Sequence, residues 1–220
     1  MRISAAFKTF CLLLAMLLGM QAWAASLPPD QLIVNLFNTS ISRVKQEQDA
    51  IKKDRHRLID LAEEVVVPYV SFDKMSKQIL GKYWRTITPD QQARFTKAFK
   101  ERVATTLIER YDSGKEWSLK IVGQPKISTD GMIALVNSEI TDVTAAKKYA
   151  ISYRFFHDEK TDKWMVFDVI VEGVSVLSSF QTAASEQMNK AGIESLISQL
   201  EKGELKTDSD NKGPKAPAQG

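Results

Sequence analysis

The sequence KWMVFDVIVEGVSVLSSF, residues 163–180, carries the strongest structural pattern in the chain. From Trp164 to Val171 every residue is apolar except Asp168. Side chains alternate between the two sides of a strand, so a strand this apolar is expected to be buried on both faces. After Gly173 the apolar residues follow helical spacing. The pattern predicts a buried strand that leads into a helix, with one carboxylate inside it.

Three further strand patterns precede this one. They lie at residues 117–122, 132–140 and 149–156 and are separated by short polar connections. Successive strands joined in this way predict an antiparallel meander of four strands.

The first half of the chain shows helical periodicity instead. Apolar stripes run through residues 32–44 and 58–66. A short helix is predicted between Ser71 as its N-cap and Gly81 as its end. A long one begins with the capping box of Thr88 and Gln91 and ends near residue 114. Helices, then four strands, then helices predict an α+β fold in which helices pack on one antiparallel sheet.

The N-terminus matches a secretory signal peptide. Arg2 and Lys8 precede an apolar core at residues 10–20, and Ala22-Trp23-Ala24 fits the cleavage pattern. The apolar core is too short to span a bilayer, and no second stretch is long enough. We therefore expect an exported chain that does not span the membrane, cleaved near Ala24.

The remaining chain is expected to form one unit. Residues 25–202 contain a helical subdomain (30–114), a sheet (115–172) and C-terminal helices (174–202). Residues 203–220 are polar and rich in Gly and Pro near their end, so we expect them to be a disordered tail.

Composition excludes several classes of function. Removing residues 1–24, with two basic and no acidic residues, reduces the net charge from +3 to +1. This balance argues against nucleic-acid binding. Cys11 lies in the signal peptide, so the exported chain has no disulfide and no thiol chemistry. His56 and His157 both lie in polar surroundings, and we expect surface positions, no metal site and no cofactor.

Asp168 has two possible roles. A carboxyl group among apolar residues can have a raised pKa and act as a base or as a hydrogen-bond donor. Alternatively, it accepts hydrogen bonds from backbone amides or a hydroxyl and fixes the strand to the helices. We favour the structural role because no catalytic partner stands at a recognisable spacing.

Two blocks of sequence resemble a known family. VPYVSFDKMSKQILGKYWRTITPDQQARFTKAFKE (67–101) and WMVFDVIVEGVSVLSSF (164–180) resemble the MlaC family, periplasmic phospholipid-binding proteins of the Mla ABC transport system, also called toluene-tolerance proteins. The shared motifs are PY–F, LGKYW and W-x-V-[FY]-D-x-x-x-EGVS, and the resemblance covers most of residues 30–200. It implies an NTF2-like or cystatin-like sheet with a helical subdomain, and a deep apolar pocket between them.

The resemblance also implies a function in the periplasm. Such a protein carries phospholipid as cargo between an inner-membrane ABC transporter complex and an outer-membrane lipoprotein–porin complex, and Asp168 is structural. We expect the pocket to be lined from the long helix and from the sheet, although a single β-bulge would exchange the two sheet faces. The predicted lining residues are Phe99, Val103, Leu107, Leu119, Ile121, Ile151, Tyr153 and Val166.

Two other functions remain open. NTF2-like sheets also form isomerases and dehydratases, in which Asp168 with Tyr153 or Tyr83 could act as an acid–hydroxyl pair. The chain could also be a periplasmic adaptor whose apolar cleft binds a partner peptide.

Overall fold

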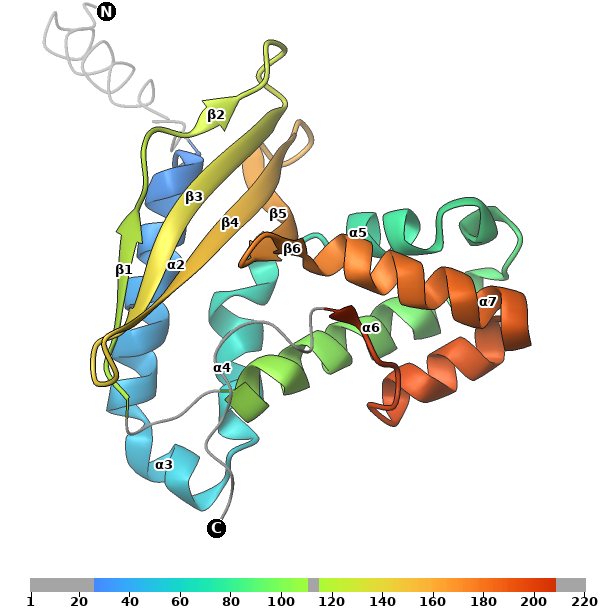
Figure 1. Cartoon of the computed structure of the whole chain (residues 1–220), viewed down its shortest axis with the longest axis horizontal. Coiled ribbons are helices and arrows are strands. Elements are labelled where there is room, and N and C mark those ends of the chain that lie inside the picture. The colour runs from blue at the N-terminus through green and yellow to red at the C-terminus, as the bar shows by residue number, and fades with distance from the viewer. Residues whose placement is uncertain (1–25, 111–114, 209–220) are drawn as a thin grey trace, which may run out of the picture.

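The computed structural model describes residues 26–110 and 115–208, and the predicted signal peptide lies outside these ranges. Helices and sheet follow the predicted α+β order (Figure 1). The helices are α2 (Pro29–Gln46), α3 (Gln48–Lys53), α4 (Arg57–Val65), α5 (Phe72–Leu80), α6 (Pro89–Arg110) and α7 (Val176–Glu201), with 3-10 turns η1 (Val67–Tyr69) and η2 (Gly81–Arg85). The strands are β1 (Trp117–Ile121), β2 (Lys126–Ile127), β3 (Ile133–Asp142), β4 (Lys147–Asp158), β5 (Lys163–Val171) and β6 (Val174–Ser175).

The four predicted strands form the antiparallel meander β1-β3-β4-β5. Two short strands extend the sheet in the described residues: β2 pairs with β3, and β6 pairs with β5. The predicted caps of the helices are present too. Thr88 and Gln91 exchange hydrogen bonds at the start of α6, and Ser71 accepts one from Lys74 N–H at the start of α5. Gly81 ends α5 with φ of 51°.

One residue of β5 has no partner in the strand ladder. Arg154 of β4 pairs with Asp168, and Phe155 pairs with Val166, so Phe167 is the extra residue of a β-bulge. The bulge directs Phe167 and Asp168 to the same side of the sheet, although they are neighbours in sequence. Val166 and Val169 stay on the other side.

The side of the sheet that carries Val166 is covered by α2, which lies behind the strands in Figure 1. We call the buried residues there the sheet cluster: Leu32, Ile33, Ala134, Val136, Phe155 and Val166.

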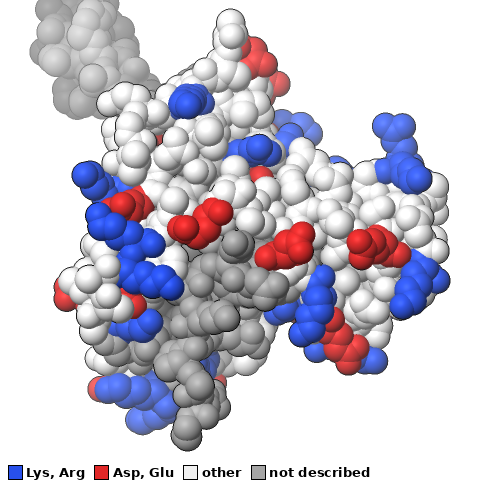
Figure 2. All heavy atoms as spheres, in the orientation of Figure 1, with Lys and Arg blue, Asp and Glu red and all other residues white. Residues whose placement is uncertain are grey.

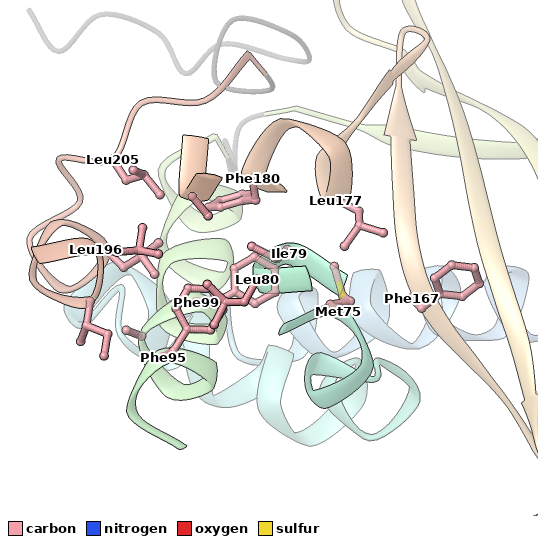
Figure 3. Close-up of a cluster of buried hydrophobic side chains, with 14 residues drawn as sticks. Met75, Ile79, Leu80, Phe95, Phe99, Phe167, Leu177, Phe180, Leu196 and Leu205 are labelled. Carbon is pink, nitrogen blue, oxygen red and sulfur yellow. The ribbon is translucent and has the colours of Figure 1, made fainter. Parts of the chain in front are cut away.

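The opposite side of β5 meets α5 and α7 through Phe167 and Asp168. Figure 3 shows side chains of α5, α6 and α7 converging next to β5. We call this group the helical cluster: Met75, Ile79, Leu80, Phe95, Ala98, Phe99, Phe167, Leu177, Phe180, Ala184, Leu196, Ile197, Leu200 and Leu205. Helices on both sides therefore bury the central part of β5, as its sequence predicts.

The boundary predicted for the polar tail is wrong. Leu205 and Thr207 are only 5% and 7% exposed, and Leu205 packs in the helical cluster (Figure 3). A single leucine in a polar segment can bury its side chain against a core formed elsewhere, which overall composition does not reveal. The rest of that segment, residues 209–220, lies outside the described part.

Candidate functional site

The two apolar clusters meet at one junction. Val70 lies between η1 and α5 and packs against both clusters. It pairs with Val166 in an isolated bridge, and the N–H of Ser71 donates to the carbonyl of Val166 at 2.9 Å. Beside it, Phe167 belongs to the helical cluster while Val166 belongs to the sheet cluster. We call this region, Val70 with Val166 and Phe167, the seam.

The predicted sheet residues share the face that α2 covers. Val166 belongs to the sheet cluster, and Leu119, Ile121 and Tyr153 pack against it. Ile151 is buried at 7% exposure and lies beside Ser138, which itself pairs with Ile121. These five predicted residues therefore form one apolar surface.

The predicted helix residues lie on the other side of the seam. Phe99 is fully buried, with its ring centroid 5.9 Å from that of Phe72 and 4.9 Å from that of Phe180. Val103 is partly buried against the same helical cluster. The side chain of Leu107 lies outside the described residues. Phe99 and Val103 thus belong to a different cluster from the sheet residues, and that all of them line one cavity stays a prediction.

One hydroxyl pair interrupts the apolar sheet surface. Burial raises the pKa of the Tyr153 hydroxyl, and its hydrogen bond with Ser138 opposes the rise but is the smaller effect. Ser138, 3% exposed, also donates to the carbonyl of Ile151 at 3.2 Å. Tyr153 is therefore neutral near physiological pH, and this surface presents no charge to a hydrocarbon chain.

Asp168 is fully buried and joins the sheet to α7. Its Oδ1 accepts from the backbone N–H of Leu177 at 3.0 Å, and its Oδ2 accepts from the Ser175 hydroxyl at 2.8 Å. A guanidinium nitrogen of Arg154 lies 3.5 Å from Oδ2. A carboxylate at this position satisfies one of the free N–H groups of the helix start and interacts favourably with the helix dipole. This is the structural role that the sequence favours.

The neighbouring EGVS residues complete the connection. Ser175 caps α7, because its oxygen accepts from Ser178 N–H at 3.0 Å while its hydroxyl donates to Asp168. Gly173 has φ of 81°, which suits the tight turn between β5 and β6. The Glu172 carboxylate accepts from the backbone N–H of Ala150. The EGVS motif in the sequence pointed to these residues, but it did not identify their hydrogen-bond partners, which come from the structure.

Possible metal ligands are dispersed over the described part of the chain. Within the described ranges, no His, Cys, Asp and Glu side chains are grouped so that they could hold a metal ion. His56 is exposed as predicted, but His157 is half-buried, 3.1 Å from Asp162, with its ring against Trp164. Acidic and basic side chains are interspersed on the face shown in Figure 2. Across residues 26–110 and 115–208, each helix is too short or too polar to cross a bilayer.

Comparison with known proteins gives consistent results. A family model described as MlaC protein matches residues 35–202. The Haemophilus influenzae "Intermembrane phospholipid transport system binding protein MlaC" is 21% identical over 177 residues, 80% of this chain and 82% of that protein. The Pseudomonas putida "Toluene tolerance protein ttg2D" is 25% identical over 173 residues, 76% of each chain. A phospholipid-binding protein from Ralstonia solanacearum, solved with a phospholipid, superposes with a TM-score of 0.73 at 16% identity, covering 81% of this chain and 97% of that one.

Proposed function

Because this chain belongs to the MlaC family, we propose that it is a periplasmic phospholipid carrier. The observation that carries the proposal is the extent of the family match, residues 35–202, which includes the seam and most residues of both clusters. Two similar proteins support it. The Haemophilus influenzae protein is named as the binding protein of an intermembrane phospholipid transport system, and the Ralstonia solanacearum protein was solved with a phospholipid.

The acyl chains bind along the uncharged sheet surface and reach across the seam toward α6. Leu119, Ile121, Ile151, Tyr153 and Val166 form the sheet side of this site. Phe99, Val103 and Leu107 form the helix side. A bound lipid lies near Val70, where the two clusters meet.

Hydrocarbon burial explains why such a carrier needs partners. Burying an acyl chain is worth about 0.8 kcal/mol per CH₂ relative to water. A membrane buries the chain equally well, so hydrocarbon burial contributes almost nothing to the free energy of transfer from membrane to protein. Docking to an inner-membrane ABC transporter complex and an outer-membrane lipoprotein–porin complex therefore sets loading and release by changing the affinity of the site.

Lipid extraction tests the proposal. The chain is exported with its own signal peptide, purified without detergent and extracted with organic solvent. We expect phospholipid in a near-stoichiometric ratio to protein. A well-folded protein free of lipid that also takes none up from phospholipid vesicles contradicts the carrier function. In that case a protein captured by the same apolar surface would favour a peptide-binding adaptor.

A second candidate is an isomerase or dehydratase that uses Asp168. The hydrogen bonds of Asp168 argue against it, since both carboxylate oxygens are occupied by the start of α7 and the side chain is fully buried. Turnover of a small ketone by the lipid-free chain would support the enzyme.

A further inference from the structure

A closed ring of four charged side chains joins the end of α2 to α4. In the last turn of α2, a guanidinium nitrogen of Arg43 lies 2.9 Å from a carboxylate oxygen of Glu47 and 2.7 Å from one of Glu64. Arg57, at the start of α4, contacts Glu47 and lies 3.0 Å from Glu64. Glu47 directly follows α2, and Glu64 belongs to α4. Two of the four contacts, Arg43 with Glu64 and Glu47 with Arg57, therefore connect the two helices.

The ring is charged and lies near the surface. Hydrogen bonds from Arg57 and Arg43 hold the pKa of the Glu47 carboxyl below its usual value, and the same two groups lower the pKa of Glu64. Both carboxyl groups are therefore ionised near neutral pH. A network of charges holds its members better than an isolated surface ion pair does, yet each contact can exchange with water at a small cost in free energy. Such a ring fastens two helices reversibly.

The second half of α2 has few other strong contacts. The buried residues of α2 all lie near its start, and Leu36 packs only partly against the sheet cluster. Residues 34–46, which all belong to the described part, are half-buried or exposed. Near the end of the helix, Val44 packs against a small apolar cluster of Ile51, Leu58 and Leu61. The position of this half of α2 thus depends largely on contacts with α3 and α4, which include the ring.

The two helices that the ring joins lead to the two sides of the proposed lipid site. α2 covers the sheet face that carries Leu119, Ile121 and Tyr153. α4 continues through η1 to Val70 of the seam. Figure 1 shows α2 and α4 rising together from the corner that α3 forms. Any movement of α2 relative to α4 therefore changes how closely the sheet face is covered.

Building on the proposed carrier function, we propose that the ring is a latch that sets the rate of lipid entry and release. While its contacts are closed, α2 stays over the sheet face and retains the acyl chains. When they separate, the second half of α2 moves away from α4 and opens a path to that face. Arg43, Glu47, Arg57 and Glu64 are positioning residues, because they act through α2 and do not touch the lipid.

Lipid exchange tests the latch. The chain is purified with its lipid, mixed with vesicles of deuterated phosphatidylethanolamine and recovered at intervals, and mass spectrometry gives the ratio of deuterated to original lipid. Arg43→Gln and Glu64→Gln should start with as much lipid as the wild type but exchange it roughly two- to fivefold faster, the factor expected for a surface ion pair. The double variant should show less than the product of the two effects, because both residues act through one contact.

Glu194→Gln is the matched control. Glu194 of α7 lies 2.9 Å from Arg94 of α6, so this surface pair also joins two helices, but neither of them is α2. The control should exchange lipid at the wild-type rate. Hydrogen–deuterium exchange provides a readout without lipid transfer: amides of residues 36–46 should lose protection in Arg43→Gln and Glu64→Gln and keep it in Glu194→Gln.

Three results overturn the latch while the carrier function stands, since lipid is still bound. These are a wild-type rate of exchange in both ring variants, unchanged protection of residues 36–46 in both, and equal acceleration by Glu194→Gln. A wild-type chain without lipid contradicts the carrier function, and the latch fails with it.

Discussion

Asp168 links two elements through a single carboxylate. The bulge at Phe167 directs it toward α7, where it accepts from Leu177 N–H and the Ser175 hydroxyl. Replacing it removes acceptors from groups that stay buried, which costs more than the loss of an exposed hydrogen bond.

We predict that Asp168→Asn lowers the free energy of unfolding by about 1–3 kcal/mol and leaves lipid bound. The physical reason is that the amide group offers one acceptor oxygen where the carboxylate offers two. Urea denaturation and lipid extraction measure the two effects. Ser175→Ala provides the matched comparison, and the double variant should lose less than the sum of the single losses because the two groups interact. A stable Asp168→Asn chain that lacks a reaction catalysed by the wild type would show a catalytic role instead.

Val103 tests the helix side of the lipid site. It is partly buried and packs against the helical cluster, on the helix side of the proposed lipid site. We predict that Val103→Glu abolishes lipid co-purification, since a carboxylate there would have to be desolvated by the acyl chains. Mass spectrometry gives the ratio of lipid to protein. Thr105→Glu, at an exposed position of the same helix, should retain lipid. Equal loading of a folded Val103→Glu chain removes this residue from the site.

At the scale of single elements, helix ends were the most predictable features. Thr88 with Gln91 starts α6, Ser71 starts α5 and Gly81 ends α5. Each of these signals is local, because a cap depends on residues three or four positions apart. The break of α7 at Gly192 (φ 77°, ψ −176°) agrees with the separate C-terminal helices expected from the sequence. Two features were not predictable in this way. The bulge at Phe167 depends on the register of β4, and Leu205 is buried only because distant helices provide a core.

The predicted lining residues also show that local patterns do not reveal contacts between residues far apart in sequence. Alternation along a strand correctly grouped Leu119, Ile121 and Tyr153 on one face, because side-chain period is a local property. It does not reveal which helices cover that face. Phe99 and Val103 belong to a separate cluster for that reason, since the assignment depends on packing between residues far apart in sequence.

α5 contains a buried hydroxyl group that destabilises the helix and can be removed by substitution. Ser76 is fully buried in this helix, and its hydroxyl has no hydrogen-bond partner among the described residues. We predict that Ser76→Ala raises the free energy of unfolding by about 1 kcal/mol, because it removes an unsatisfied polar group and favours the helix. Ser71→Ala in the same segment should lower it by about 1 kcal/mol by deleting the cap. Thermal or urea unfolding measures both, and a destabilised Ser76→Ala chain would reveal a hidden partner for the hydroxyl.

At the scale of the whole molecule, export is the clearest prediction from sequence. If Ala22-Trp23-Ala24 directs cleavage, the mature N-terminus is Ala25 or a residue next to it. Intact-mass spectrometry of the periplasmic fraction measures this. The control is a double variant, Ala22→Asp with Ala24→Asp, which removes both small residues of the cleavage pattern and keeps Trp23. It should accumulate the uncleaved precursor. A wild-type chain that retains residues 1–24 contradicts the prediction.

The helical cluster combines two helices that precede the sheet in sequence with one that follows it. Phe99 of α6 lies between Phe72 of α5 and Phe180 of α7, and α7 follows only after the entire sheet. Contacts between residues this far apart form late, because the intervening chain must first be closed into a loop. If the chain is exported with its N-terminus first, as its sequence predicts, the rings of Phe95 and Phe99 are exposed until the last helix has arrived. We therefore expect a chain that ends before α7 to aggregate more readily than the whole chain, because Phe180 no longer covers Phe99.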